Sequence, residues 1–509
     1  MKTHKGILFG FYPCCTFRKG YDKMKEVLQI KQNIKDTIFH IQIFLIYFNK
    51  EGIFMNRTIA AIATPPGEGG IAVIRISGTN AHQIAEKVFC PINSNRKLQE
   101  TKGYTALFGH FIWKGKKCDE VVALSFRAPH SYTGEDVVEL SCHGGNTAPL
   151  LLLQACIESG AEPAGPGEFT RRAFENGRIT LTQAEAVMDM ISATGKQGAA
   201  MAAAALDGAL AKRIDGLRTK LTALAGHLAA WIDFPEEDVP ELEQNTLQEI
   251  LNYCVAQLQQ LVDSYGIGAV LRRGVDTVIV GSPNVGKSTL LNLLAGFERA
   301  IVTPIAGTTR DIVEQQVQLG QVRLNLFDTA GIRETQDIVE AEGIRRSYKK
   351  LEQAGLILAV YDASRPICEE DLLLAQKCQE IPALAILNKN DLEKQFDSEK
   401  LKPYFEYMVE ISAKNDSFFP NLIQSIEQVL GVSNINPDAG ILASQRQLDA
   451  TNQALGALKE AIFAQQQGLD LDAIGVCVDD ALYALYQLTG EQASEAVVDE
   501  VFSTFCVGK

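Results

Sequence analysis

The segment from residue 281 to residue 288 reads G-S-P-N-V-G-K-S and matches the pattern G-x-x-x-x-G-K-[ST]. An apolar run, Val275–Val280, precedes it, and a helix-like segment, 288–295, follows it. Glycines in such a loop let backbone N–H groups turn toward phosphate oxygens, and the helix N-terminus adds its dipole. We expect Lys287 to reach the β- and γ-phosphates of a nucleotide and Ser288 to bind Mg²⁺.

Three further motifs each follow a short apolar run. The first, D-T-A-G at 328–331, offers an aspartate that can hold Mg²⁺ through water and a glycine N–H that can sense the γ-phosphate. The second, N-K-N-D at 388–391, ends in Asp391, whose carboxylate can accept two N–H bonds from guanine that adenine cannot supply. The third, S-A-K at 412–414, completes a guanine pocket. With the phosphate loop, these motifs predict a GTP-binding domain.

The residue that orients the attacking water in many GTPases is missing after the D-T-A-G motif. Many GTPases have a water-orienting glutamine at the next position, but here it is Ile332, whose aliphatic side chain cannot hold water. Either hydrolysis is very slow, or another nearby group orients the water. The candidates are Arg333, Glu334, Asp337 and Glu340. The segment T-P-I-A-G-T-T-R-D at 303–311 lies where a GTPase places its first switch, and a threonine there can complete the Mg²⁺ coordination.

The composition narrows the class of protein. The 509 residues suffice for about three domains. Lys and Arg number 48 against 62 Asp and Glu, and this net charge of −14 argues against a dispersed basic surface for nucleic acid. The eleven cysteines include no C-x-x-C pair, which argues against a zinc site or a disulfide framework. No apolar run reaches the ~20 residues of a membrane span. We therefore expect a cytoplasmic protein without a membrane segment.

Residues 1–54 differ from the rest of the chain. They contain nine basic and four acidic residues, so their net charge is +5 and residues 55–509 carry −19. They fit neither a signal peptide nor a transit peptide, because Pro13 breaks the first apolar run and the segment has no serine and one arginine. We interpret them as a non-native or disordered extension from an upstream start codon, because a stretch of different character opens at Met55. The alternative is a genuine short helical arm.

The rest of the chain divides into four segments. Residues 55–172 alternate β-rich runs with Gly/Pro turns, which is typical of a mixed α/β domain. Residues 173–273 and 432–509 show helical periodicity. Residues 274–431 alternate strands and helices, which predicts a parallel sheet covered on both faces, as in a P-loop (Ras-like) GTPase domain. We therefore expect a multidomain α/β and all-α chain, with the GTPase domain inserted in a discontinuous helical domain.

Together these motifs resemble the tRNA modification GTPase family MnmE, also called TrmE. Two further stretches carry the resemblance: A-T-P-P-G-E-G-G-I-A-V-I-R-I-S-G, which begins at Ala63, and T-G-E-D-V-V-E-L-x-x-H-G-G, which begins at Thr133. The chain also ends F-C-V-G-K. The resemblance covers residues 55–509. It implies a homodimer whose G domains meet when K⁺ binds.

The resemblance assigns roles in the nucleotide site. It implies that Asn284, Thr303, Ile305 and Thr308 hold K⁺ and that Ser288 and Thr309 hold Mg²⁺. Glu340 matches the acidic residue that orients water, and Arg310 is a second candidate catalytic residue. A fixed monovalent cation can neutralise developing charge as an arginine finger does. The expected GTP-binding residues are Asn284, Val285, Gly286, Lys287, Ser288, Thr289, Thr303, Pro304, Ile305, Ala306, Gly307, Thr308, Thr309, Asp328, Thr329, Ala330, Gly331, Asn388, Lys389, Asp391, Ser412, Ala413 and Lys414.

The resemblance also implies that the N-terminal domain binds a tetrahydrofolate derivative, in its 5-formyl or 5,10-methylene form, as a one-carbon donor. The matching positions are Arg75, Glu139, Arg178 and the C-terminal Lys509. Relatives can have lysine at the position of Arg178, which keeps the charge. From the residues alone, Arg75 would be a surface charge at the end of a strand and Glu139 a solvated strand residue. Cys506 is a candidate nucleophile or a packing residue, since no base lies beside it in sequence.

The implied activity is GTP hydrolysis coupled to tRNA modification. With a flavin-dependent partner, MnmG or GidA in this family, in a heterotetramer-type complex, the chain would add a carboxymethylaminomethyl-type group to carbon 5 of the wobble uridine of certain tRNAs. The charge of −19 indicates that the partner supplies much of the tRNA-binding surface. Two alternatives stay open. A regulatory GTPase with no part in the chemistry would lack folate binding, and a ribosome-assembly GTPase would bind ribosomal particles.

Overall fold

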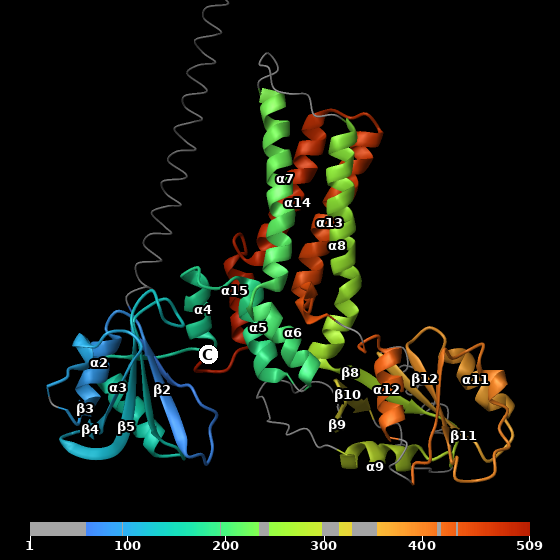
Figure 1. Cartoon of the computed structure of the whole chain (residues 1–509), viewed down its shortest axis with the longest axis horizontal. Coiled ribbons are helices and arrows are strands. Elements are labelled where there is room, and N and C mark those ends of the chain that lie inside the picture. Colours follow the sequence, from blue (N-terminus) through green and yellow to red (C-terminus); the bar gives the residue numbers. More distant parts are fainter. Residues whose placement is uncertain are drawn as a thin grey trace, which may run out of the picture. The chain divides into compact units, whose positions relative to one another are not determined.

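The computed structural model describes residues 57–93, 95–193, 195–233, 244–297, 315–327, 354–414, 419–433 and 436–509. They form two compact units (Figure 1). The first contains the described residues up to Asn176 together with Cys506–Lys509, and the second is Gly177–Phe505. From the sequence we expected the last four residues in the helical domain, whereas here they fold with the first unit. None of the described helices combines the length and apolar character that crossing a membrane requires.

The first unit is built on a seven-stranded sheet, as far as the described residues show, in the order β3-β4-β5-β6-β2-β1-β7. Neighbouring strands pair antiparallel, except that β1 and β7 are parallel. The β-rich runs expected in residues 55–172 include 71–76, which lies in β2, and 137–140, which lies in β6. The strands are β1 (Ile59–Ile62), β2 (Ile71–Ser77), β3 (Phe89–Pro91), β4 (Thr105–Trp113), β5 (Lys116–Phe126), β6 (Val137–His143) and β7 (Glu162–Pro163).

The alternation of side chains along β2 separates a core face from a polar face. Ala72, Ile74 and Ile76 are buried in the core that also includes residues of α2 (Ala81–Val88) and α3 (Ala148–Glu158). Because successive side chains of a strand point to opposite faces, Arg75 lies on the other face. There a smaller cluster brings Phe169 of α4 (Glu168–Glu175) against β1. A short 3-10 helix, η1 (Leu98–Glu100), precedes β4.

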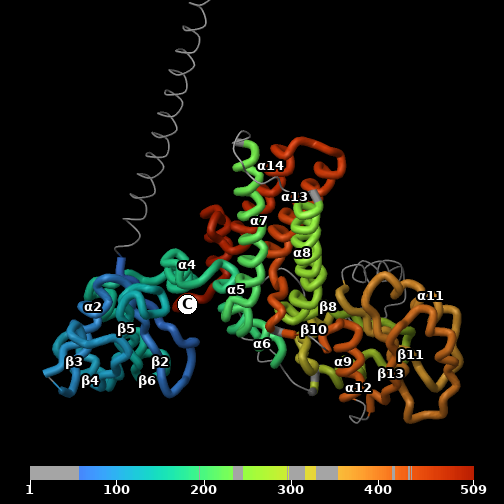
Figure 2. The backbone as a smooth tube through the Cα atoms, turned by 45° about the horizontal axis from the view of Figure 1, so that its top comes forward, coloured from blue at the N-terminus to red at the C-terminus, as the bar shows by residue number. Residues whose placement is uncertain are grey.

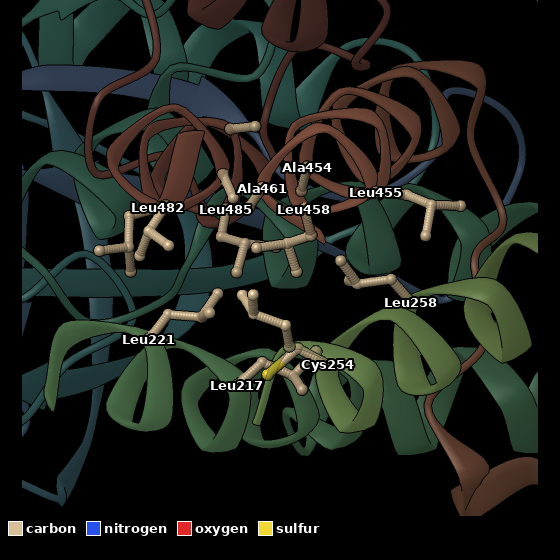
Figure 3. Close-up of a cluster of buried hydrophobic side chains, with 14 of the residues drawn as sticks. Leu217, Leu221, Cys254, Leu258, Ala454, Leu455, Leu458, Ala461, Leu482 and Leu485 are labelled. Atoms are coloured by element: carbon tan, nitrogen blue, oxygen red, sulfur yellow. The ribbon is translucent and has the colours of Figure 1, made fainter. Parts of the chain in front are cut away.

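The second unit begins and ends with helices, as expected. Four long helices, α7, α8, α13 and α14, lie lengthwise against one another (Figure 2). Their apolar residues recur every three or four positions, which gives each helix one apolar face. Figure 3 shows Leu217 and Leu221 of α7 facing Leu485 of α14 across this core. The helices are α5 (Leu181–Ser192), α6 (Lys196–Leu206), α7 (Ala209–Asp233), α8 (Gln244–Arg273), α13 (Gln445–Gln466), α14 (Leu471–Thr489) and α15 (Glu495–Ser503).

Along the chain, the segment between α8 and α13 forms a second sheet. It is six-stranded over the described residues, in the order β13-β12-β11-β8-β10-β9. All neighbouring pairs are parallel except the hairpin of β9 and β10. The strands are β8 (Val275–Val280), β9 (Gln315–Leu319), β10 (Val322–Phe327), β11 (Leu356–Asp362), β12 (Ala383–Asn388) and β13 (Tyr407–Glu410). The run Val275–Val280 and the three apolar runs expected before the D-T-A-G, N-K-N-D and S-A-K motifs are thus confirmed as the strands β8, β10, β12 and β13, whereas β9 was not expected.

Helices cover both faces of this sheet. Leu290 of α9 (Lys287–Phe297) and Leu422 of α12 (Phe419–Val429) belong to the core on one face. Ala375 of α11 (Glu369–Lys377) belongs to the core on the other. The predicted combination of an N-terminal α/β domain, a helical domain and a P-loop-type α/β domain is therefore confirmed. Short 3-10 helices, η2 (Ser398–Leu401) and η4 (Pro437–Ala439), complete the described elements.

The sheet and the helices are joined within the second unit. The tip of the β9–β10 hairpin contacts the connection between α5 and α6, where the backbone N–H of Gln197 donates to Oε1 of Gln321 at 3.1 Å. In addition, Arg323 on β10 donates to the carbonyl of Ser192 at 3.0 Å. These bonds hold the hairpin that connects the D-T-A-G motif to the segment of the expected first switch.

A buried ion pair ties α5 to the start of α13. The carboxylate of Glu185 accepts from Arg446 at 2.8 and 3.0 Å and from Gln447 at 2.7 Å. Burial works against the charged carboxylate, but the bonds from Arg446 and Gln447 outweigh it and hold the pKa of Glu185 below its ordinary value. The pair is therefore ionised at neutral pH, and each partner depends on the other.

Replacing Glu185 should destabilise the helical part of the chain. Glu185→Ala takes the carboxylate away from the partly buried Arg446 guanidinium, which keeps only its bonds to the carbonyls of Gln487 and Leu488, and it should cost about 3 kcal/mol in the free energy of unfolding. Urea denaturation followed by circular dichroism measures this loss. The matched control is Glu399→Ala, which removes an exposed pair with Lys402 and should change stability by about 0.5 kcal/mol or less. Equal losses in the two variants would contradict the structural role of the buried pair.

Candidate functional site

The phosphate loop connects β8 to α9, and its two glycines occupy positions that other residues cannot fill. Gly281 has φ +154°, and a Cβ there would lie 2.3 Å from the carbonyl oxygen of Val360. Gly286 has φ +102°, and a Cβ there would lie 2.2 Å from Nδ2 of Asn388. Contacts this short exclude a side chain, so the loop packs directly against β11 and β12.

The loop wraps around the ammonium group of Lys287. Its Nζ donates to the carbonyl oxygens of Gly281 and Ser282, both at 2.9 Å. Burial lowers the pKa of Lys287. The side chain is thus held inside the loop at the N-terminus of α9, where free backbone N–H groups favour a phosphate.

A single buried side chain connects three of the predicted motifs. Asn388 is 2% exposed at the end of β12. Its Nδ2 donates to the carbonyl of Val285 in the phosphate loop at 2.8 Å, and its Oδ1 accepts from the N–H of Ala413 at 2.9 Å. The phosphate loop, N-K-N-D and S-A-K motifs are therefore brought together, as their placement after parallel strands predicted. The bridging role of Asn388 had no signal in the sequence beyond the motif itself.

The carboxylate expected to select guanine is fixed and charged. Ser412 donates to Oδ1 of Asp391 at 2.8 Å, and this bond lowers the pKa of Asp391. Lys389, in a left-handed conformation with φ 68°, has its Nζ 2.5 Å from Oδ2 of Asp362 at the end of β11. Sequence reasoning missed Asp362, because nothing in the motifs points to that strand end.

Side chains that could hold a cation from the phosphate loop are accessible. Asn284, Ser288 and Thr289 are all exposed. Mg²⁺ takes few protein ligands and is completed by phosphate oxygens and water, which fits a lone hydroxyl at the start of α9. Accordingly, no group of three or more His, Cys, Asp or Glu side chains among the described residues is placed to hold a metal ion. The expected residues Thr303, Pro304, Ile305, Ala306, Gly307, Thr308, Thr309, Arg310, Asp328, Thr329, Ala330, Gly331 and Glu340 lie outside the described residues.

A second polar cluster lies on the polar face of β2 in the first unit. Nε of Arg75 donates to Oε1 of Glu139 on β6 at 2.8 Å, and the two residues are register partners in the sheet. The guanidinium lies 5.2 Å from the ring centroid of Tyr132 and 5.6 Å from that of Phe169. Arg75 is therefore enclosed by an acid and two aromatic rings, and it is not the surface charge at a strand end that the pattern alone indicated.

The C-terminus of the chain completes this cluster. The backbone N–H of Gly167 donates to the carbonyl of Cys506 at 3.3 Å, and that of Phe169 donates to the carbonyl of Lys509 at 3.3 Å. Gly508 has φ +99°, and a Cβ there would lie 2.3 Å from the carbonyl oxygen of Ile62. Only glycine fits at this position, so the end of the chain has a defined conformation.

The charges of the cluster affect one another. Burial lowers the pKa of Lys509, and Arg75 adds to this effect while Glu139 opposes it. Three of the four expected folate residues, Arg75, Glu139 and Lys509, are thus together in the first unit. Arg178 belongs to the second unit, and Cys506 is exposed.

A hollow of about 690 Å³ opens in the same unit. It lies between the 65–69 loop, the Gly144-Gly145 turn and α3, and Val507 of the C-terminal tail also lines it. Its size is that of a small-molecule site. Neither Arg75 nor Glu139 lines it.

Comparisons with known proteins cover nearly all the described chain. The family model described as "GTP-binding protein TrmE N-terminus" matches residues 58–178, and "MnmE helical domain" matches residues 181–506. The tRNA modification GTPase MnmE of Clostridioides difficile (strain 630) is 39% identical over 460 residues, 90% of this chain and 100% of that protein. The protein of the same name from Symbiobacterium thermophilum is 42% identical over 459 residues, 89% of this chain and 99% of that protein.

Two solved structures of GTPases also match part of the chain. An Era variant from Aquifex aeolicus bound to GDP.AlF4- is 28% identical, with 36% of this chain and 66% of that chain covered and a TM-score of 0.23. The FeoB G-domain from Methanococcus jannaschii is 26% identical, with 31% of this chain and 98% of that chain covered and a TM-score of 0.23.

Replacing Asp391 tests the assignment of the guanine pocket. Asp391→Asn exchanges a double acceptor for a group that also donates, so GTP should bind between about 2 and 5 kcal/mol more weakly. Xanthosine triphosphate, which presents an acceptor where guanine has its amino group, should bind better than GTP. Equilibrium titration with the two nucleotides measures both effects. A variant that keeps the wild-type preference for GTP would show that the pocket is misassigned.

Proposed function

Because this chain belongs to the MnmE family of tRNA modification GTPases, we propose that its GTP hydrolysis drives the modification of the wobble uridine of certain tRNAs. The group added is of the carboxymethylaminomethyl type, and it is added at carbon 5 of the base. The observation that carries this proposal is the presence, in one chain, of a guanine-nucleotide site joined by Asn388 and an enclosed Arg75–Glu139–Lys509 cluster. A GTPase with a purely regulatory role would not need the Arg75–Glu139–Lys509 cluster.

We propose a role for the described side chains of the nucleotide site. Lys287 and the N–H groups of the phosphate loop bind the β- and γ-phosphates, and Ser288 contributes to Mg²⁺. Asp391 binds the guanine edge, while Ser412 keeps that carboxylate oriented. These contacts hold the nucleotide but do not orient the attacking water, so the hydrolytic step needs further groups.

We place those groups in the switch segments. Together with Asn284 of the phosphate loop, Thr303, Ile305 and Thr308 would hold K⁺, which when bound would supply positive charge beside the phosphates. Thr309 completes the Mg²⁺ site, and Glu340 orients the water in place of the glutamine that Ile332 replaces. Arg310 is the second candidate for a catalytic contact. Asn284 supports this proposal because its side chain is exposed at the loop, with φ 62°.

The cluster around the C-terminus is proposed to hold a tetrahydrofolate derivative, which supplies a one-carbon unit. Arg75 and Lys509 carry positive charge that suits the carboxylates of folate, and Glu139 can accept from N–H groups of a pterin ring. Arg178, the fourth residue that the resemblance implies for folate, belongs to the second unit. Cys506 is exposed and stays a candidate for the chemistry.

The proposed assembly contains two copies of this chain and a flavin-dependent partner of the MnmG (GidA) type, in the cytoplasm. The acidic charge of this chain supports a division of labour in which the partner binds most of the tRNA. A ribosome-assembly role is the rival proposal, and binding to ribosomal particles rather than to a flavoprotein would favour it.

Nucleoside analysis of tRNA tests the whole proposal. Cells that lack this chain should lose the modified wobble uridine, and the wild-type chain should restore it. The Lys287→Ala variant should fail to restore it, because it cannot bind the phosphates. An unchanged nucleoside profile in cells that lack the chain would exclude a role in tRNA modification.

Potassium dependence tests the hydrolytic step. Turnover of GTP should be at least about fivefold faster in KCl than in matched NaCl, equivalent to about 1 kcal/mol of transition-state stabilisation. Asn284→Ala should lose most of this stimulation yet still bind GTP, and Glu340→Ala should slow turnover without weakening nucleotide binding. Steady-state assays of the three proteins in both salts give these values. Equal wild-type rates in the two salts would end the K⁺ assignment.

Folate binding tests the second cluster. Arg75→Ala should weaken the binding of 5-formyltetrahydrofolate by at least about tenfold, because an enclosed charge loses its ligand contact. GTP turnover should be unaffected, since Arg75 belongs to the other unit. Lys117→Ala, an exposed residue of β5 paired with Glu120, is the matched control and should bind folate like the wild type. Calorimetric titration separates these outcomes, and equal affinities for all three proteins would exclude the cluster as the folate site.

A further inference from the structure

The segment from the end of β11 into α11 contacts both the N-K-N-D motif and the phosphate loop. At its start, Asp362 pairs with Lys389 of the N-K-N-D motif. At its end, Asp371 in the first turn of α11 accepts a hydrogen bond at 3.0 Å from the hydroxyl of Ser282, the second residue of the phosphate loop. No motif in the sequence marks either aspartate, and the proposed hydrolysis does not use them.

Asp371 is completely buried and its two carboxylate oxygens have different partners. Oδ1 accepts from Ser282 and, at 2.9 Å, from Nη2 of Arg365. Oδ2 accepts from the backbone N–H and the thiol of Cys368, both at 3.1 Å, which caps the N-terminus of α11. Burial raises the pKa of this carboxyl, but the bonds from Cys368, Ser282 and Arg365 outweigh it and keep the group ionised at neutral pH. Oδ2 therefore caps α11, and Oδ1 binds the phosphate loop.

Ser282 is linked in turn to the lysine that binds phosphate. Its backbone carbonyl accepts from Nζ of Lys287 at 2.9 Å, while its side chain is held by Asp371. The neighbouring Gly281 allows no side chain against Val360, so the start of the loop is held on two sides. A buried charged acceptor gives a stronger hydrogen bond than a neutral one, so this contact restrains the loop effectively.

We propose that Asp371 is a positioning residue for GTP binding, which acts through the hydroxyl of Ser282 to hold the phosphate loop and Lys287 in the conformation that receives the phosphates. Asp371 does not touch the nucleotide itself. The inference rests on the proposed GTP site, and it adds the contact that holds the phosphate loop of that site before the nucleotide binds. The alternative is that Asp371 only caps α11. The two roles can be tested separately, because Oδ1 binds Ser282 whereas Oδ2 binds Cys368 at the helix cap.

The test uses the full chain and fluorescent GDP. Ser282→Ala removes the contact to Oδ1 but leaves the cap intact, so the dissociation constant should rise about tenfold through faster release. The thermal unfolding midpoint should fall by only about 2–4 °C, because Oδ1 of Asp371 keeps its bond from Arg365. Ser282→Thr keeps a hydroxyl and should restore binding. Glu369→Ala changes an exposed charge in the same helical turn and should bind like the wild type.

A double-mutant cycle connects the two residues. If Asp371 acts through Ser282, adding Ser282→Ala to Asp371→Ala should weaken GDP binding no further. Wild-type affinity in Ser282→Ala, or fully additive losses in the double variant, would overturn the proposal while the wild type still binds GDP. Failure of the wild-type chain to bind GDP would instead overturn the proposed GTP site, so the two results are distinguishable.

Discussion

The buried side chain of Asn388 is the interaction on which the nucleotide site depends. Loops at the carboxyl ends of parallel strands carry many backbone polar groups, and each one that is buried needs a hydrogen-bond partner. Asn388 supplies partners to the loops on both sides, to the carbonyl of Val285 and to the N–H of Ala413. The phosphate loop and the guanine motifs therefore hold one another in place, and Ser282 extends this arrangement to α11 through Asp371.

The cluster of Arg75, Glu139 and Lys509 also depends on hydrogen-bond partners for backbone groups. Here the end of the chain, rather than a loop, supplies these partners. Chain termini are poorly ordered unless they are tied down. Here the N–H groups of Gly167 and Phe169 bind carbonyls of the last four residues, and Gly508 fits closely against Ile62. The terminal Lys509 is thereby fixed near Arg75, where a few charged groups are partly shielded from water. Such shielding strengthens electrostatic contacts with a ligand.

The sequence predicts the parallel strands and the motifs of the second sheet well, because apolar runs in this kind of sheet are buried on both faces and are followed by functional loops. It does not predict β9, whose residues Gln315–Leu319 include only two apolar side chains and form a strand by pairing with β10. The return of Cys506–Lys509 to the first unit depends on contacts between residues more than 300 positions apart. Asp371 is hidden for a similar reason, since its sequence context is that of an ordinary helix cap.

The central claim is that these loops form a site selective for guanine nucleotides, and comparative nucleotide binding tests it most directly. Titration of the nucleotide-free chain with GDP, GTP and ATP, in the same buffer with Mg²⁺, gives the three dissociation constants. Because the site presents a fixed carboxylate to the guanine edge, GTP and GDP should bind at least about a hundredfold more tightly than ATP. Equal affinities for GTP and ATP would contradict the account.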